Sequence, residues 1–171
     1  MPTWTLKTGE VVTIRAIAPE DEPLLVEFHQ TLSEESVFLR YAHMIKLSQR
    51  IRHDRLHRIC HPTPDESVWV AVYGPPTTPE IVAVARLNQI PETEEAEFAL
   101  LVSDRFQHRG LGTRLLQHLV EVARQHQFVR IFGEILPENH DMEHVCQALG
   151  FHVQFDLETG FVLAELNLDP A

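Results

Sequence analysis

The sequence predicts a single α/β domain with about seven strands. A length of 171 residues with 44% apolar residues suits one domain with a sizeable core. Three strand-like segments follow one another in the middle of the chain, as in an antiparallel meander. After them, helix-like and strand-like segments alternate, and two strand-like segments close the chain. We therefore expect one domain over residues 1–171.

The first third of the chain is expected to hold one strand and three helices. Val11–Ile17 alternates apolar and polar residues, as a half-buried strand does. Pro19 and the three acidic residues after it favour a helix start, because negative charge there complements the helix dipole. Ser33 is typical of the cap of a second helix. A third helix is expected from about Ser48 to Cys60, before two prolines.

The remaining segments follow from residue type and periodicity. Aromatic and β-branched residues predict strands, and these are expected at Ser67–Tyr73, Ile81–Ile90, Glu94–Ser103, Phe128–Leu136, Phe151–Leu157 and Phe161–Leu168. An amphipathic helix is expected within Asp104–His126. A last helix is expected over Pro137–Gly150, with the proline at its start and the glycine at its C-terminal cap.

Two glycines, Gly110 and Gly112, stand at the head of the amphipathic helix. A glycine inside a helix costs about 1 kcal/mol relative to alanine, so their presence needs a reason. The first N–H groups of a helix are free to bind an anion, and glycine lets a phosphate approach the backbone closely. We therefore expect the amides of residues 107–113 to bind a phosphate, although close helix packing alone is an alternative. The spacing excludes a nucleotide P-loop and gives little support to a dinucleotide fold.

The run Gln107-His108-Arg109-Gly110-Leu111-Gly112 fits the Q/R-x-x-G-x-G/A motif of the GNAT superfamily of N-acetyltransferases. The similarity continues through Ala96–Leu116 and Ile135–Phe151, and the order of elements resembles that family along nearly the whole chain. This resemblance implies a single mixed, mostly antiparallel central sheet with helices on both faces. It also implies acetyl-CoA as co-substrate and a primary amine as acceptor.

A narrower resemblance concerns Leu32–Ala42 and Ala96–Leu116. These segments resemble the catalytic domain of bacterial Pat-type enzymes, which acetylate the active-site lysine of acyl-CoA synthetases and often carry an extra domain. The implied acceptor is therefore a lysine of an acyl-CoA synthetase or of another protein. Two alternatives stay open. One is acetylation of a small amine or polyamine, and the other is a non-catalytic acyl-CoA sensor.

The resemblance also implies roles for individual residues. The pyrophosphate of coenzyme A is expected on the backbone of Gln107, His108, Arg109, Gly110, Leu111, Gly112 and Thr113. The pantetheine arm is expected along Leu100, Leu101 and Val102, in a strand that bulges and splays from its neighbour. A free N–H near Leu100 would polarise the thioester carbonyl. Asn139 is expected to bind pantetheine, or to cap the helix that follows it.

A general base is needed because an alkylammonium is not a nucleophile. Glu97 is the candidate, since it lies within an apolar strand where burial would raise the pKa of its carboxylate. Glu95 is the reserve candidate, and a solvated strand face is the alternative reading of Glu97. Cys146 stands where many family members carry a proton-donating tyrosine, but a buried apolar role suits a free cysteine better. Arg40 and Tyr41 are expected either to contact the acceptor or to serve the core and the surface.

Charge and composition limit the partners. The chain has 25 acidic and 14 basic residues, a formal net charge of -11. This argues against a nucleic-acid partner and suits a cationic acceptor, or simply solubility. Two distant cysteines and the lack of a signal-like or membrane-spanning segment lead us to expect a cytoplasmic protein without a membrane partner. Dimers are frequent in the resembling family, so a homodimer is one alternative.

Histidines recur at helical spacing at two places in the chain. His53, His57 and His61 are spaced four residues apart, and His140 and His144 repeat the interval. Such spacing can present two metal ligands on one helix face. The first run ends in prolines, however, and the H-E-x-x-H pattern does not occur. We therefore expect solvated helix faces and no metal.

Overall fold

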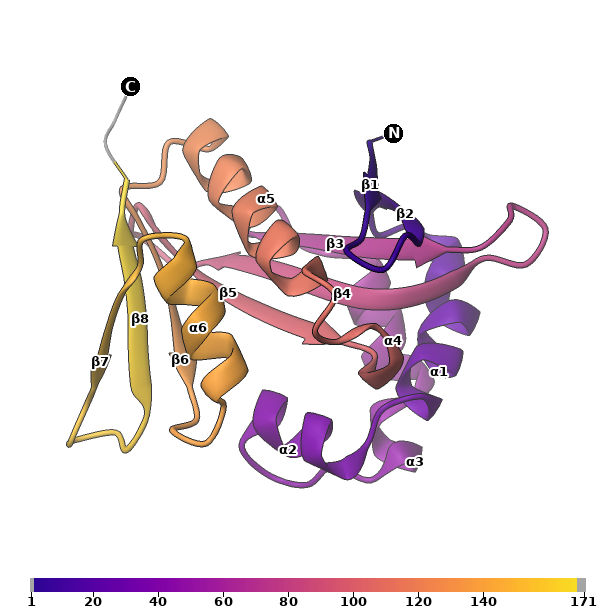
Figure 1. Ribbon diagram of the computed structural model, residues 1–171, viewed down its shortest axis with the longest axis horizontal. Coiled ribbons are helices and arrows are strands. Elements are labelled where there is room, and N and C mark those ends of the chain that lie inside the picture. The colour runs from indigo at the N-terminus through magenta and orange to yellow at the C-terminus, as the bar shows by residue number, and fades with distance from the viewer. Residues whose placement is uncertain (1, 169–171) are drawn as a thin grey trace.

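A computed structural model describes residues 2–168 and confirms the predicted fold class (Figure 1). One mixed sheet has the strand order β1-β2-β3-β4-β5-β6-β8-β7. All of its pairings are antiparallel except that of β5 with β6. The strands are β1 (Thr3–Thr5), β2 (Val11–Ala16), β3 (Glu66–Tyr73), β4 (Glu80–Gln89), β5 (Glu95–Val102), β6 (Arg130–Ile135), β7 (His152–Phe155) and β8 (Val162–Asn167). The additional strand, β1, is too short for its alternation to be read from the sequence.

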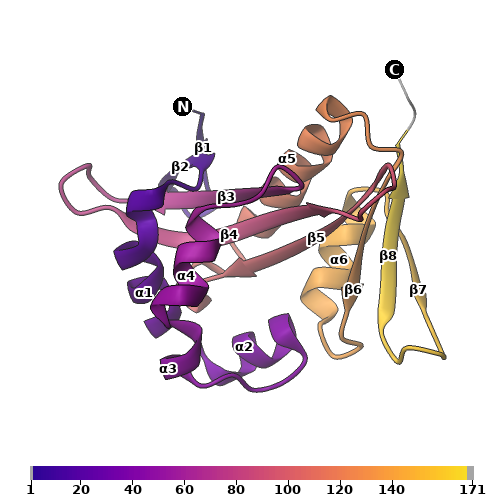
Figure 2. The same ribbon diagram turned by 180° about the vertical axis from the view of Figure 1, so that it is seen from behind.

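Helices cover both faces of the sheet. On one face lie α5 (Leu111–Gln125) and α6 (His140–Ala148), and on the other lie α1 (Glu22–Gln30) and α4 (His53–Cys60) (Figures 1 and 2). Two further helices, α2 (Glu34–Tyr41) and α3 (Leu47–Arg50), lie beyond the edge of β5 in both views. Single 3-10 turns, η1 (Pro19–Asp21) and η2 (Asp104–Phe106), precede α1 and α5. Within residues 2–168, no helix combines the length and the apolar character that crossing a bilayer requires.

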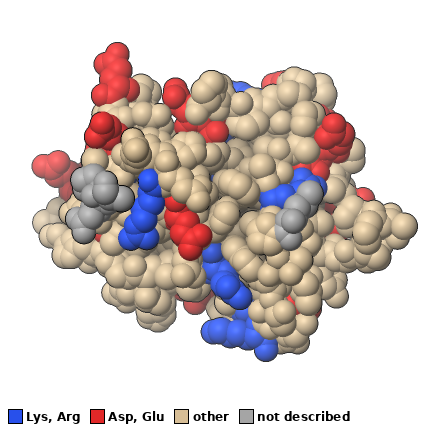
Figure 3. Space-filling model, turned by 90° about the horizontal axis from the view of Figure 1, so that it is seen from above, with Lys and Arg blue, Asp and Glu red and all other residues tan. Residues whose placement is uncertain are grey.

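Each face of the sheet has its own core. The face under α5 and α6 buries a large cluster that includes Ala96, Phe98 and the apolar stripe of α5. That stripe recurs at helical spacing, with Leu111, Leu115, Leu119 and Val122 buried, as an amphipathic helix requires. The opposite face buries a smaller cluster with Leu25, Phe28, Leu56 and Leu101. On the surface seen from above, acidic and basic side chains are interspersed (Figure 3).

The expected single helix over Ser48–Cys60 is wrong, because the chain forms two helices, α3 and α4. The break follows Arg50, whose buried guanidinium donates hydrogen bonds to the carbonyls of Ile45 (3.0 Å) and His29 (3.1 Å). The two hydrogen bonds accompany the turn between α3 and α4, and helical periodicity in the sequence does not indicate this turn. The start at Pro19 also differs, since residues 19–21 form η1 and α1 begins at Glu22. The Ser33 cap is confirmed, because its side chain accepts a hydrogen bond from the Ser36 N–H.

The feature that shapes the site is the divergence of β5 from β6. The two strands pair in parallel only where Glu95–Glu97 faces Arg130–Phe132, and they then separate (Figure 1). The splay expected for this strand is therefore present. The expected bulge is not, since the register between β5 and β4 runs continuously from Gln89↔Ala96 to Ala83↔Val102. Divergence, rather than a bulge, leaves backbone groups of β5 unpaired.

Close packing between β5 and β6 depends on a glycine. A Cβ added at Gly133 would lie 2.6 Å from the Phe98 ring, well inside contact distance. That ring also meets Phe151 edge-on, with the ring centroids 5.6 Å apart. Phe98 therefore occupies the space that any side chain at position 133 would need.

We expect Gly133→Ala to lower the free energy of unfolding by about 1–3 kcal/mol, because overpacking forces a buried ring to shift. Urea-induced unfolding measures this loss. Gly112→Ala is the matched control, since an added Cβ there meets no atom within 4 Å. An unchanged stability of the Gly133 variant would contradict the packing argument.

Candidate active site

A cavity of about 680 Å³ opens where β5 and β6 diverge. This volume is in the range of small-molecule sites. The residues that line it come from β5, from the loop before α5, from the connection between β6 and α6, and from α2. Most of the expected site residues meet there, namely Glu97, Leu100, Leu101, Val102, Gln107, His108, Gly110, Gly112, Thr113 and Asn139.

The start of α5 has the geometry of an anion site. Gly110 adopts φ +86°, a left-handed conformation that favours glycine, and α5 begins at the next residue. The space beside Gly112 is open, because an added Cβ would meet nothing within 4 Å. The packing of the protein therefore does not require a glycine at position 112. A ligand that approaches the backbone closely would require one. The free N–H groups and the open backbone fit a phosphate.

Two residues of the motif direct their side chains elsewhere. The Arg109 guanidinium pairs with Glu10 at 2.6 Å and lies 5.0 Å from the centre of the Phe106 ring. Leu111 is buried in the core under α5. For these two positions only the backbone remains available to a phosphate, because their side chains hold the loop against the rest of the fold.

Sequence reasoning missed Lys7, which follows β1. Lys7 lines the cavity, and its Cε lies 3.3 Å from the point where a side chain of Gly110 would begin. Its N–H donates a hydrogen bond to the Arg109 carbonyl (3.2 Å). About a hundred residues separate Lys7 from the motif, so no local pattern could have connected them. The structure adds a cation beside the candidate phosphate site.

The Gln107 side chain joins three parts of the site. Its amide nitrogen donates hydrogen bonds to the Ser36 hydroxyl and to the Val102 carbonyl, each at 3.0 Å. It therefore links α2, the end of β5 and the loop before α5. This glutamine orients the loop, and its backbone remains at the entrance to the candidate phosphate site.

Strand alternation directs the Leu100 N–H into the divergence. Successive residues of an antiparallel strand present their N–H and C=O groups to opposite neighbours. Ser103 faces β4, because its N–H donates to the Val82 carbonyl (2.8 Å). Leu100, three residues earlier, therefore faces the side from which β6 has diverged, and its N–H is available to a ligand. The Val102 carbonyl faces the same way and accepts the Gln107 bond.

Asn139 combines a structural position with access to the cavity. Its Oδ1 accepts a hydrogen bond from the Met142 N–H (3.2 Å) and so caps α6. The residue also lines the cavity. The capping role is therefore observed, and contact with pantetheine stays a prediction.

Glu97 lies half-buried on the sheet face opposite α5, since its neighbours Ala96 and Phe98 point to the core under that helix. Burial raises the pKa of the Glu97 carboxylate, the nearby Glu134 carboxylate raises it further, and the Arg40 guanidinium opposes both effects. Within residues 2–168, Glu97 makes no hydrogen bond or ion pair through its side chain. The reserve candidate, Glu95, is instead paired with Arg130 at 3.1 Å.

The other candidate residues, Arg40 and Tyr41 for the acceptor and Cys146 for proton donation, lie in different surroundings. Arg40 lines the cavity, and its guanidinium lies 4.7 Å from the centre of the Tyr41 ring. Tyr41 lines only a second, small cavity, to which Arg40 also contributes. Cys146 is fully buried in the core, where burial raises the pKa of its thiol to about 12. This burial contradicts a proton-donating role for Cys146.

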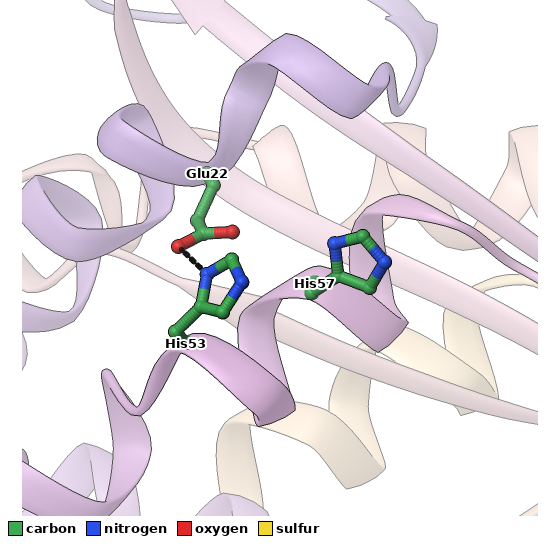
Figure 4. A group of neighbouring side chains, drawn as sticks. All are labelled: Glu22, His53 and His57. Atoms are coloured by element: carbon green, nitrogen blue, oxygen red, sulfur yellow. Dashed lines mark hydrogen bonds and ion pairs between the residues drawn. The ribbon is translucent and has the colours of Figure 1, made fainter.

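The histidine run meets a carboxylate that the sequence did not predict. Glu22 Oε2 lies 2.7 Å from His53 Nδ1, and potential ligand atoms of Glu22, His53 and His57 lie within 4.8 Å of one another (Figure 4). His61 stacks on His57, with the ring centroids 4.0 Å apart. Glu22 begins α1 and His53 begins α4, so their contact joins the two helices. It is a hydrogen bond that becomes an ion pair when the imidazole is protonated, and Glu22 raises the pKa of His53.

A sheet opened by divergence beside a glycine-containing helix start is the architecture of the N-acetyltransferases that the sequence resembles. The chain belongs to the acetyltransferase (GNAT) family, whose family model matches residues 26–151. The expected family, fold class and enzyme class are thereby confirmed.

Individual relatives agree with this assignment. An acetyltransferase of Pseudomonas aeruginosa is 28% identical over 152 residues, which cover 89% of this chain and 81% of the relative. Acetyltransferase Pat of Mycolicibacterium smegmatis is 26% identical over 167 residues, which cover 96% of this chain. The matched region is only 48% of that longer relative.

Solved structures show the same fold. The GNAT domain of S. lividans PAT superposes with a TM-score of 0.86 at 30% identity, covering 98% of this chain and 96% of that one. The PaiA N-acetyltransferase of Thermoplasma acidophilum, solved in complex with coenzyme A, has a TM-score of 0.71 at 16% identity. It covers 92% of this chain and 99% of its own. At this low identity the likeness concerns the fold alone.

We expect Gly112→Ala to separate ligand binding from stability. The free energy of unfolding should stay equal or rise by up to about 1 kcal/mol, because alanine favours a helix. Binding of coenzyme A should weaken about tenfold or more, since the added Cβ enters the space beside the free amides. Isothermal titration calorimetry with coenzyme A measures the affinity. Unchanged affinity would contradict a phosphate site at this helix start.

Proposed function

We propose that this protein transfers an acetyl group from acetyl-CoA to a primary amine, and that the amine is a protein lysine. The observation that carries the proposal is the unpaired, half-buried Glu97, which lines the same cavity as the glycine-containing start of α5. A base and an anion site in one cavity are what this transfer requires. The family assignment supports the same activity.

Binding of acetyl-CoA is supported by the residues around the cavity. The amides of residues 107–113 would hold the pyrophosphate, with Lys7 adding a positive charge. The free edge of β5 from Leu100 to Val102 would pair with the pantetheine amides. Asn139 would contribute its side-chain amide from the start of α6. Acetyl-CoA supplies the activated acyl group as a thioester.

The chemistry assigned to the chain is proton transfer and charge stabilisation. Glu97 would take a proton from the acceptor ammonium, directly or through water, and leave a neutral amine. The amine nitrogen then bonds to the acetyl carbon while the carbon–sulfur bond breaks and the thiolate leaves. The second proton of the nitrogen passes to solvent. The Leu100 N–H would stabilise the negative charge on the carbonyl oxygen.

The choice of a protein lysine as acceptor rests on the resemblance of Leu32–Ala42 and Ala96–Leu116 to Pat-type enzymes. An active-site lysine of an acyl-CoA synthetase is the first acceptor to examine. We also propose that residues 1–171 form one catalytic domain that acts in the cytoplasm, as a monomer or a homodimer.

A labelling experiment tests the acceptor. The purified protein is incubated with [¹⁴C]acetyl-CoA and a cell extract divided by dialysis into macromolecules and small metabolites. Label in the macromolecular fraction, located on lysine by mass spectrometry, is the expected result. Label confined to the metabolites would replace the protein lysine with a small amine. Bound acetyl-CoA with label in neither fraction would favour a sensor.

We expect Glu97→Gln to lower kcat by about 10²–10⁴-fold, the usual contribution of a general base. Binding of acetyl-CoA should change less than about twofold, because Glu97 lies away from the phosphate-binding amides. Glu95→Gln tests the reserve candidate and should retain turnover, since that carboxylate is paired with Arg130. Steady-state kinetics and calorimetry measure the two effects. Full turnover by the Glu97 variant would overturn its role.

The pH dependence should follow the raised pKa of Glu97. A base acts only when it is deprotonated, so kcat/KM should fall as pH drops through the pKa of Glu97 in the folded protein. Since this pKa lies above the ordinary glutamate value, the fall should begin at a higher pH than for an exposed glutamate. A pH profile of kcat/KM measures the midpoint. A profile that is the same in Glu97→Gln would contradict the assignment.

A further inference from the structure

We propose that Glu134 and Asn88 complete, with Glu97, a three-acceptor site for the ammonium group of the acceptor. Glu134 binds the incoming cation, and Glu97 removes its proton. This inference rests on the proposed acetyl transfer to an amine and adds the residue that selects a charged acceptor. No local sequence pattern distinguishes Glu134 or Asn88.

The register of the sheet places these residues on one face. Glu97 faces Phe132 in the parallel pairing of β5 with β6, so both side chains point to the same side of the sheet. Glu134 lies two residues beyond Phe132 and therefore shares that side. On the other flank, Asn88 of β4 faces Glu97 directly. All three polar residues line the large cavity.

The carboxylates of this face divide into two groups. Arg130 pairs with Glu95 at 3.1 Å and with Glu165 at 2.6 Å. It thereby neutralises two carboxylates away from the cavity. Within residues 2–168, neither Glu97 nor Glu134 forms an ion pair. Among the described residues, the two carboxylates where the cavity is lined by β5 and β6 therefore lack an ion-pair partner.

Arg40 also lines the cavity, and its guanidinium lies over the Tyr41 ring. Its positive charge acts on Glu97 in opposition to Glu134, but the effect of Glu134 is the larger of the two. The repulsion between Glu97 and Glu134 is therefore only partly offset. A cation between two like carboxylates relieves their repulsion, so the site gains most from a charged acceptor.

Asn88 supplies the third acceptor. Its Oδ1 is buried and, among the described residues, has no hydrogen-bond partner. Leaving a buried oxygen unpaired is unfavourable. Because Asn88 lines the cavity, a turn of its side-chain amide would bring this oxygen to a ligand with a free N–H. An ammonium carries three donors and no acceptor. Glu97, Glu134 and Asn88 offer it one oxygen acceptor each.

Glu134 and Glu97 should affect different kinetic parameters. Glu134→Gln keeps the shape of the side chain but removes the charge, so the KM for the amine should rise about tenfold or more. The value of kcat should stay within about twofold, because Glu97 still accepts the proton. Glu138→Gln is the matched control, since it removes one exposed charge four residues away that does not line the cavity.

The kinetic test uses Nα-acetyl-lysine amide as the acceptor probe and measures thiol release from acetyl-CoA. An effect on KM in Glu134→Gln that is absent in Glu138→Gln supports the site. A KM within about twofold of the parent value, or a loss of kcat without a change in KM, would overturn it.

A second measurement does not depend on turnover. NMR of ¹³C-labelled glutamate carboxyls, with Glu97→Gln to assign the signal, follows the Glu97 titration with and without the probe. Glu134→Gln should lower the midpoint of the Glu97 titration and weaken the change that the probe causes in the Glu97 signal. Arg40 and Arg130 are not substituted in this variant. A parent protein that binds acetyl-CoA but shows no probe-induced shift would overturn the ammonium site. In that case the labelling experiment on cell extract would still test, independently, whether the protein transfers acetyl groups.

Discussion

The divergence of β5 from β6 is the constraint on which the rest of the structure depends. Three residues of parallel pairing hold the strands together, and beyond them the Phe98 ring fills the space that a side chain at Gly133 would need. Backbone N–H and C=O groups seldom stay unpaired, so the free edge of β5 must be satisfied from elsewhere. Gln107 satisfies Val102, and the Leu100 N–H remains for a ligand.

Charge on the sheet follows from the same geometry. Where β5, β6 and β8 lie side by side, Arg130 reaches a carboxylate on each flank. Where β6 has turned away from β5, no arginine of β6 or β8 reaches Glu97 or Glu134. The strand pairing thus separates the carboxylates that form ion pairs from those that, among the described residues, form none. Burial, and after it the nearby Glu134 carboxylate, raises the pKa of Glu97, and no ion pair with Arg130 offsets them.

Much of the architecture was predictable from local patterns, and the errors have physical causes. Patterns within a few residues predict the meander, the amphipathic α5, the Ser33 cap and the role of the glycine pair at the start of α5. The break after Arg50 does not, because it accompanies hydrogen bonds to carbonyls that lie outside α3 and α4. The expected bulge in β5 fails for a related reason, since strand register is set by the neighbouring strand.

The sequence by itself determined the fold class, the family, the helix start with the two glycines that is the candidate anion site, and the strand that contains the candidate base. These features depend on periodicity, capping and glycine placement, which are local properties. Only the tertiary structure decided that, within residues 2–168, Glu95 forms an ion pair while Glu97 forms none, and that Lys7 adjoins Gly110. Those outcomes depend on which distant segments meet, and no local pattern specifies the partner of a buried or paired side chain.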